Sequence, residues 1–219
     1  MFKPYTIDVG KFLIKLARKA VESYLTRGII ITPPEDTPKQ LLQDNYGVFT
    51  TIEIIRDNET ELRGCIGYPK GYQNVATATI RSAIAAATED PRFEPLRVEE
   101  LNHVVFEISI LGPITELKVS KPREYLEKII IGRHGLIIQK NFFSGLLLPQ
   151  VPVEFCWDVI TFLNETCVKA LLLPNCWVDL EHTKLMIYEA QVFKELSPNG
   201  DVIERDLVKE YREKCEGKS

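Results

Sequence analysis

The sequence contains neither a long apolar run nor a cluster of basic residues, and these absences exclude two classes of protein. Its uncharged apolar runs, such as residues 145–148, are far shorter than the about 20 residues of a membrane-spanning helix. No four consecutive residues are basic, and 27 Lys and Arg stand against 31 Asp and Glu, a formal net charge of −4. Because non-specific nucleic-acid binding relies on a clustered basic surface, nucleic acid is not expected as the main ligand.

The first residues lack the basic, apolar and small-residue order of a signal peptide, because Asp8 and Lys11 interrupt the apolar stretch. We therefore expect a cytoplasmic protein. An odd number of cysteines in such a chain argues against a disulfide framework. No C-x-x-C pair occurs, so neither a zinc ribbon nor a zinc finger is expected, and no residue is assigned as a metal ligand. The five cysteines are Cys65, Cys156, Cys167, Cys176 and Cys215.

Several catalytic motifs are also missing. The sequence has no G-x-x-x-x-G-K-[ST] phosphate loop, no G-x-G-x-x-G turn, no G-x-S-x-G elbow and no H-E-x-x-H pair. Nucleotide hydrolysis, Rossmann-type redox chemistry, α/β-hydrolase chemistry and zincin proteolysis all lose support. The residues imply no particular cofactor.

What is present predicts an α+β fold. An apolar stripe predicts a helix over residues 9–25, capped by Asp8 and stopped by Gly28. Two strand patterns around Asp57-Asn58 predict a hairpin, and strict alternation predicts a strand over 103–111. Further helices are expected at 73–88, 122–130 (capped by Ser120), 158–170 and 206–214, and strands at 136–139, 145–148 and 184–193. Without regular βαβ alternation, this order predicts a mostly antiparallel sheet flanked by helices.

The segment Leu62-Arg63-Gly64-Cys65-Ile66-Gly67 is the most suggestive of chemistry. Residues two apart in a strand share a face, so Arg63 would hold Cys65 as the nucleophilic thiolate. Gly64 and Gly67 would let a substrate or another backbone approach closely. In the alternative interpretation, which the residues favour, Cys65 is a small buried hydrophobe and the glycines admit the alanine-rich helix.

Two further residues are candidates for proton transfer. Glu107 lies in mid-strand among apolar residues, where a carboxylate is costly unless it is paired or faces a cleft. An ion pair with Arg63 or Arg81 is the structural alternative. His134 lies between glycines in Gly132-Arg133-His134-Gly135, a turn that would expose an imidazole at a strand edge. It is equally well explained as a turn residue in a left-handed conformation.

The chain resembles the AMMECR domain family, named for a human chromosomal region linked to Alport syndrome and midface hypoplasia. The matching blocks run from about residue 12 to residue 195 in the family's order. The combination of the R-G-C-I-G and L-L-P-Q-V blocks is highly specific. These blocks include residues 63–67, 83–87, 90–96, 107–111, 134–136, 145–151, 162–163 and 167–170, with Pro113, Trp157 and Trp177.

The resemblance implies one AMMECR-like domain over residues 1–219, with a larger lobe (about 1–115 plus 150–200) and a smaller lobe (about 116–150). It also implies an archaeal or bacterial stand-alone member. In many microbes the domain is associated with a Memo-type protein, similar to non-haem iron dioxygenases, and with a radical S-adenosylmethionine protein. The reaction of the family itself is unassigned.

Two functions follow from these observations. As a binding or accessory component of a modification pathway, the protein would have an inert Cys65 and an exposed apolar patch with a polar rim. As an enzyme, it would use Cys65 as nucleophile or redox thiol in an inter-lobe cleft, Arg63 to hold the thiolate, and Glu107 or His134 to move protons. The binding interpretation is slightly preferred.

Overall fold

The computed structural model describes residues 1–57 and 59–217, which form two compact units. The N-terminal unit comprises Lys3–Leu111 and Gln191–Arg205, and the C-terminal unit comprises Met1–Phe2, Gly112–Ala190 and Asp206–Ser219. Strand β7 (Lys184–Glu195) contributes residues to both. These boundaries differ from the expected lobes, because residues 150–190 group with residues 112–149.

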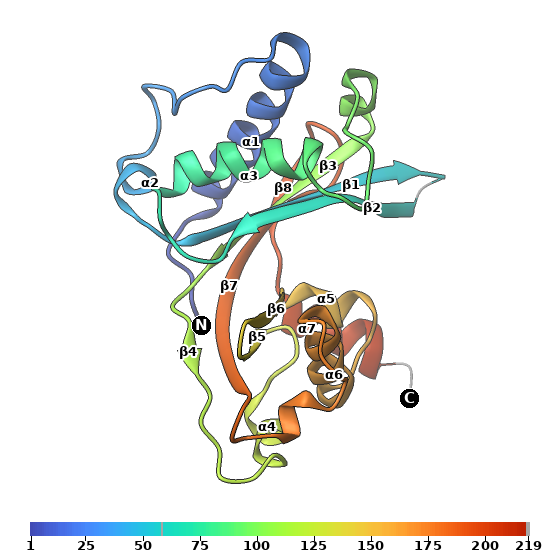
Figure 1. Cartoon of the computed structure of the whole chain (residues 1–219). Helices are drawn as coiled ribbons and strands as arrows, with labels where there is room; N and C mark the ends of the chain where they lie inside the picture. The colour runs from blue at the N-terminus through green and yellow to red at the C-terminus, as the bar shows by residue number, and fades with distance from the viewer. Residues whose placement is uncertain (58, 218–219) are drawn as a thin grey trace. The chain divides into compact units, whose positions relative to one another are not determined.

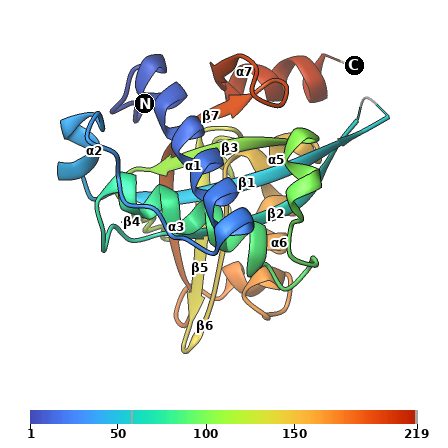
Figure 2. The ribbon, with the colours of Figure 1, turned by 90° about the horizontal axis from the view of Figure 1, so that it is seen from above.

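The N-terminal unit is an antiparallel sheet with helices on one face. Strand β1 is central, between β2 and β3, and β8 pairs with the end of β7. Helices α1 and α3 pack against each other and cover one face of β1, β2 and β3 (Figures 1 and 2). The elements are α1 (Ile7–Arg27), α2 (Lys39–Gln43), β1 (Gly47–Arg56), β2 (Glu59–Tyr68), α3 (Val75–Thr88), the short 3₁₀ helix η1 (Val98–Asn102), β3 (Val104–Leu111) and β8 (Val202–Glu204).

Helix α1 ends where the sequence predicts and begins slightly earlier. Gly28 has a φ of 66° and its N–H donates to the carbonyl of Tyr24, the left-handed C-terminal stop that glycine favours. Thr6 occupies the N-cap position, so the prediction that Asp8 is the cap is wrong. Asp8 lies in the first turn, where its charge favours the positive end of the helix dipole.

Helix α3 lies very close to the sheet, and small residues make this possible. Asn74 caps the helix by accepting a hydrogen bond from the Thr77 N–H at 2.9 Å. The hydroxyls of Thr50 on β1 and Ser82 on α3 are 2.7 Å apart. A Cβ on Gly64 would collide with the backbone carbonyl of Ala86. Gly64 therefore admits the alanine-rich helix, as the packing interpretation of the motif predicts.

In the C-terminal unit a small antiparallel sheet packs with short helices. Strand β5 pairs with β6 and with β7, and β4 pairs with β7. Helix α6 packs on β6, where the absence of a side chain at Gly145 makes room for the backbone at Ala170. The elements are β4 (Thr115–Glu116), α4 (Glu124–Lys128), β5 (His134–Lys140), β6 (Phe143–Leu147), α5 (Gln150–Glu154), α6 (Val159–Lys169), the 3₁₀ turn η2 (Cys176–Val178), α7 (Leu207–Tyr211) and the π-helical turn η3 (Arg212–Glu216).

The two predicted helix caps in this unit have different outcomes. Asp158 caps α6 by accepting a hydrogen bond from the Thr161 N–H at 2.8 Å, which confirms that helix start. Ser120 does not cap α4, which begins after Arg123. The N–H of Ser120 instead donates to the Glu124 carboxylate. The alternation of paired strands with packed helices in both units confirms the α+β class and the mostly antiparallel pairing.

Four of the five cysteines form disulfides, so the prediction that the chain lacks a disulfide framework is wrong. Cys156 is joined to Cys215, with Cα atoms 5.4 Å apart, and Cys167 to Cys176, with Cα atoms 5.9 Å apart. Cys65 is the free cysteine. The prediction relied on an expected cellular compartment and on an odd cysteine count, but the distance between cysteines in the folded chain decides which of them can pair. Among the described residues, no helix combines the length and apolarity needed to cross a bilayer.

Candidate functional site

Three polar side chains form a line across the sheet of the N-terminal unit. On β1, Thr51 is paired with Cys65 of β2 on one side and with Glu107 of β3 on the other. Directly paired residues of antiparallel strands share a face. Thr50 and Gly64 face α3, so this polar row, Cys65–Thr51–Glu107, lies on the face away from α3.

The sulfur and the backbone of Cys65 each have a polar partner. The hydroxyl of Thr51 donates to Cys65 Sγ at 3.3 Å. The N–H of Cys65 points out of the sheet edge and donates to Asp90 Oδ2 at 2.9 Å. Thr51 and Cys65 therefore form a pair without backbone hydrogen bonds between them, the type in which side chains approach most closely.

Asp90 links this strand edge to the chain after α3. Its buried carboxylate accepts hydrogen bonds from the Cys65 N–H and from Arg92, whose Nη2 is 2.7 Å from Oδ2. Burial opposes ionisation, but the hydrogen bonds from Arg92 and from the two backbone N–H groups lower the pKa of Asp90 to about 2. The sequence interpretation did not identify Asp90 as this anchor.

Cys65 is kept in its protonated form. Burial raises the pKa of the thiol, and Glu107 and Asp90 raise it further by charge repulsion with the thiolate. The hydrogen bond from Thr51 and the positive charge of Arg92 lower it, but less than burial raises it. The arrangement therefore disfavours a standing thiolate at neutral pH.

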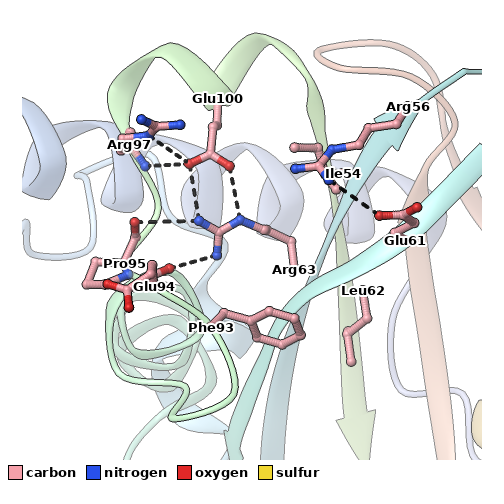
Figure 3. A pocket seen from close by; sticks show the side chains of 10 residues that line it. All are labelled: Ile54, Arg56, Glu61, Leu62, Arg63, Phe93, Glu94, Pro95, Arg97 and Glu100. Atoms are coloured by element: carbon pink, nitrogen blue, oxygen red, sulfur yellow. Dashed lines mark hydrogen bonds and ion pairs between the residues drawn. The ribbon is translucent and has the colours of Figure 1, made fainter.

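Arg63, expected beside Cys65, is bound elsewhere (Figure 3). Its Nε lies 3.0 Å from Oε1 of Glu100 and its Nη2 lies 3.1 Å from Oε2, while Nη1 donates to the Glu94 carbonyl at 2.8 Å. The register of β1 and β2 shifts between Ile52 and Glu53, and this irregularity leaves Arg63 without a partner on β1. Arg92 is the cation that acts on the thiol.

The Arg63–Glu100 pair forms a wall of an open pocket of about 630 Å³ in the N-terminal unit (Figure 3). Arg56 and Glu61 form a second, looser pair, 3.7 Å apart, on its rim. Three arginines and three glutamates line the pocket, so their charges balance. The lining residues are Ile54, Arg56, Glu61, Leu62, Arg63, Phe93, Glu94, Pro95, Arg97 and Glu100.

Glu107 is buried and forms an ion pair. Its Oε2 lies 2.7 Å from Nη1 of Arg205, and both side chains are almost fully enclosed. The prediction that Glu107 forms an ion pair is confirmed, but the prediction that its partner is Arg63 or Arg81 is wrong, because the partner is Arg205. Arg205 follows β8 and is 98 residues away in the chain, so only the fold brings it to Glu107.

His134 is the first residue of β5, in the C-terminal unit. It is buried, which corrects the prediction that this turn exposes its imidazole. The N–H of Ile130 donates to its Nδ1 at 3.1 Å, and burial, with the nearby Arg133, lowers the pKa of the ring. The imidazole is thus neutral with its proton on Nε2. A role for His134 in proton transfer at Cys65 stays a prediction.

The second motif glycine also faces the protein's own atoms. Gly67 is paired with Phe49, and a Cβ there would collide with the phenylalanine ring. The proposed binding role of Gly64 and Gly67 stays a prediction. Over residues 1–57 and 59–217, no three His, Cys, Asp or Glu side chains are grouped so as to hold a metal ion.

The C-terminal unit exposes large apolar side chains. Phe142, at the tip of the β5–β6 hairpin, is fully exposed, and Leu171 and Leu173, just after α6, are 82% and 77% exposed. A hollow of about 460 Å³ includes Leu173 in its lining, with Lys140, Leu172, Asn175, Cys176, Val178 and Asp179. The 2.8 Å ion pair between Lys140 and Asp179 gives this hollow a polar border.

Comparison with known proteins assigns the family. The AMMECR1 family model matches residues 14–193, most of the chain. The chain belongs to the AMMECR1 family. A protein from Caldivirga maquilingensis is 57% identical over 216 residues, 98% of each chain, and one from Pyrobaculum arsenaticum is 57% identical over 98% of this chain and 99% of its own.

A relative in this family has a known crystal structure. The uncharacterised protein from Pyrococcus horikoshii is 45% identical, and the match covers 90% of this chain and 97% of that chain with a TM-score of 0.86. This similarity supports the α+β architecture described above. The relatives are themselves uncharacterised, so the AMMECR1 family assignment leaves the activity to be argued from the site.

Proposed function

We propose that this AMMECR1-family protein is an accessory or binding component of a modification pathway, with Memo-type and radical S-adenosylmethionine proteins as partners. The observation that carries this proposal is the state of Cys65. A cysteine nucleophile acts as the thiolate, yet burial raises the pKa of this thiol and the motif arginine is bound to Glu100. The choice of partners rests on the family resemblance.

Two further features support a binding role. In the polar row, the Thr51 hydroxyl donates to Cys65 Sγ and Glu107 is paired with Arg205, so these groups hold one another in place, which suits a structural role better than a reactive one. Exposed apolar side chains at Phe142, Leu171 and Leu173, bordered by charged residues, are what a protein that associates with others requires.

The protonation state of Cys65 can be measured directly by alkylation. Without reductant, the other four cysteines are in disulfides, so iodoacetamide labels Cys65 alone. We expect the labelling rate to rise only above the ordinary thiol pKa of about 8.5. Thr51→Val removes the hydroxyl that stabilises the thiolate and should move the profile to higher pH. A profile with its midpoint below about 8.5 would contradict the binding proposal.

Association is tested with the purified partners. Memo-type and radical S-adenosylmethionine proteins from the same organism are mixed with this protein under non-reducing conditions and analysed by size-exclusion chromatography with light scattering. We expect a complex with at least one of them at micromolar concentration. Separate elution of all three proteins, confirmed by calorimetry without a heat of binding, would refute the choice of partners.

The second candidate function is a cysteine-centred enzyme. The observation that favours it is the position of the buried Glu107 in the same row as Thr51 and Cys65, because a carboxylate near a cysteine can serve as its general base. Cys65 would be the nucleophile or redox thiol, and Glu107 would accept its proton when substrate binds. A substrate-like electrophile that labels the native protein tenfold faster than Glu107→Gln, with Cys65→Ala unlabelled, would favour this function over the first.

A further inference from the structure

The two disulfides differ in how accessible they are to other molecules. Cys167 is completely buried on α6 and Cys176 is 7% exposed, so their bond is enclosed. Cys156 is exposed and Cys215 is half-buried, so a second protein or a small thiol can reach their bond. Accessible disulfides are the labile ones, whereas enclosed disulfides are structural.

The accessible disulfide holds the C-terminal turn in place. Turn η3, which contains Cys215, has no buried residue of its own. Besides the disulfide, Lys214 Nζ donates to the Glu154 carbonyl at 2.7 Å, and at the end of α7 Tyr211 donates to the Trp157 carbonyl at 3.0 Å. Single hydrogen bonds at the surface contribute little net stability, whereas the disulfide ties η3 covalently to Cys156.

Helix α7, which precedes η3, has an attachment of its own, whereas the backbone at Cys156 is in an unfavourable conformation. Leu207, at the start of α7, is buried and adjoins Gly132, so α7 has an attachment that does not depend on the disulfide. At the other partner, Cys156 has a φ of 51°, in the left-handed region that residues other than glycine rarely adopt. Loss of the bond would therefore release η3 and relax the backbone at Cys156, while α7 stays docked.

We propose that Cys156–Cys215 is an exchange site for a dithiol reductant and that its reduction releases the C-terminal turn. One thiolate of the dithiol attacks Sγ of Cys156, forming a mixed disulfide, and Cys215 leaves as a thiolate that takes a proton from water. The second thiolate of the reductant then attacks the reductant's sulfur in the mixed disulfide, which breaks the bond to Cys156 and releases Cys156 as a thiolate that takes a proton from water. Two electrons pass from the dithiol to the protein, giving two protein thiols and the oxidised reductant. Cys167–Cys176 stays closed.

The test follows both disulfides in the native protein. Cys65 is first blocked with iodoacetamide, the protein is incubated with dithiothreitol, and new thiols are trapped with N-ethylmaleimide and located by mass spectrometry. We expect Cys156 and Cys215 to be labelled at least tenfold faster than Cys167 and Cys176. Equal rates for the two pairs would overturn the proposal, because accessibility would then not distinguish them.

Release of the turn is measured by limited proteolysis. Trypsin should cleave after Arg212 and Lys214 at least fivefold faster in the selectively reduced protein than in the oxidised protein. The Cys156→Ser, Cys215→Ser double variant should be cleaved at the fast rate without reductant. Unchanged cleavage after selective reduction of the wild-type protein would show that the turn stays docked, and would refute its release even if the variant failed to fold.

Discussion

Asp90 offers a sharp test of how the candidate site is assembled. Its carboxylate holds the N–H of Cys65 and the guanidinium of Arg92, and its pKa in the folded protein is about 2 instead of 3.8. A shift of this size corresponds to about 2.4 kcal/mol of stability at neutral pH, at about 1.4 kcal/mol for each pKa unit. Asp90→Asn removes the charge and should lose a similar amount.

The pH dependence distinguishes this effect from a simple packing defect. Because folding lowers the pKa of Asp90, its contribution is fully present above the unfolded-state pKa and is lost as pH falls from about 4 to about 2. The difference in unfolding free energy between wild type and Asp90→Asn should shrink by about 1 kcal/mol between pH 7 and pH 3, and by about 1 kcal/mol more by pH 2.

Urea melts of both proteins at each pH measure this difference. Asp8→Asn is the matched control: it removes one exposed carboxylate from the same unit, and we expect it to cost less than about 1 kcal/mol. A difference between wild type and Asp90→Asn that stays constant from pH 7 to pH 3 would refute the reasoning, because Asp90 would then not titrate below its ordinary range. Reversible two-state melts are needed for the comparison.

Three further changes test the backbone and the disulfides. Gly64→Ala places a Cβ against the Ala86 carbonyl and should cost about 1–3 kcal/mol in urea melts. Gly28→Ala meets no neighbouring atom but keeps a φ of 66°, so we expect a loss of about 1 kcal/mol by the same measurement. Replacing Cys156 and Cys215 by Ser removes a cross-link between residues 59 apart. The chain entropy that the cross-link removes from the unfolded state corresponds to about 4 kcal/mol, so we expect a lower melting temperature. A thermal melt unchanged from wild type would contradict this expectation.

Patterns carried by neighbouring residues were predictable from the sequence. The apolar stripe before Gly28, the turn at Asp57, the strand β3 and the Asp158 cap each depend on a few consecutive residues, and the structure confirms them. The close approach of α3 at Gly64 was also foreseen as one of two alternatives, because small residues in a helix and a strand permit it.

The site itself was only partly predictable. Cys65 and Glu107 were selected because a thiol between glycines and a carboxylate within an apolar strand are unusual. Thr51, which stands between them, carries no such signal, since threonine is an ordinary strand residue. A shift in the register of β1 and β2 redirected Arg63 to Glu100, and strand register depends on the whole sheet and not on spacing along one strand.

The sequence by itself determined the longer helices and strands, the α+β class and the family, because periodicity and motif blocks are local properties of the chain. Only the tertiary structure decided which charges and thiols meet: Arg205 with Glu107, Arg92 with Asp90 at the Cys65 edge, and Cys156 with Cys215. Ion pairs and disulfides act over a few ångströms, and folding brings together Glu107 and Arg205, which are 98 positions apart in the chain. Folding therefore sets the chemistry of Cys65.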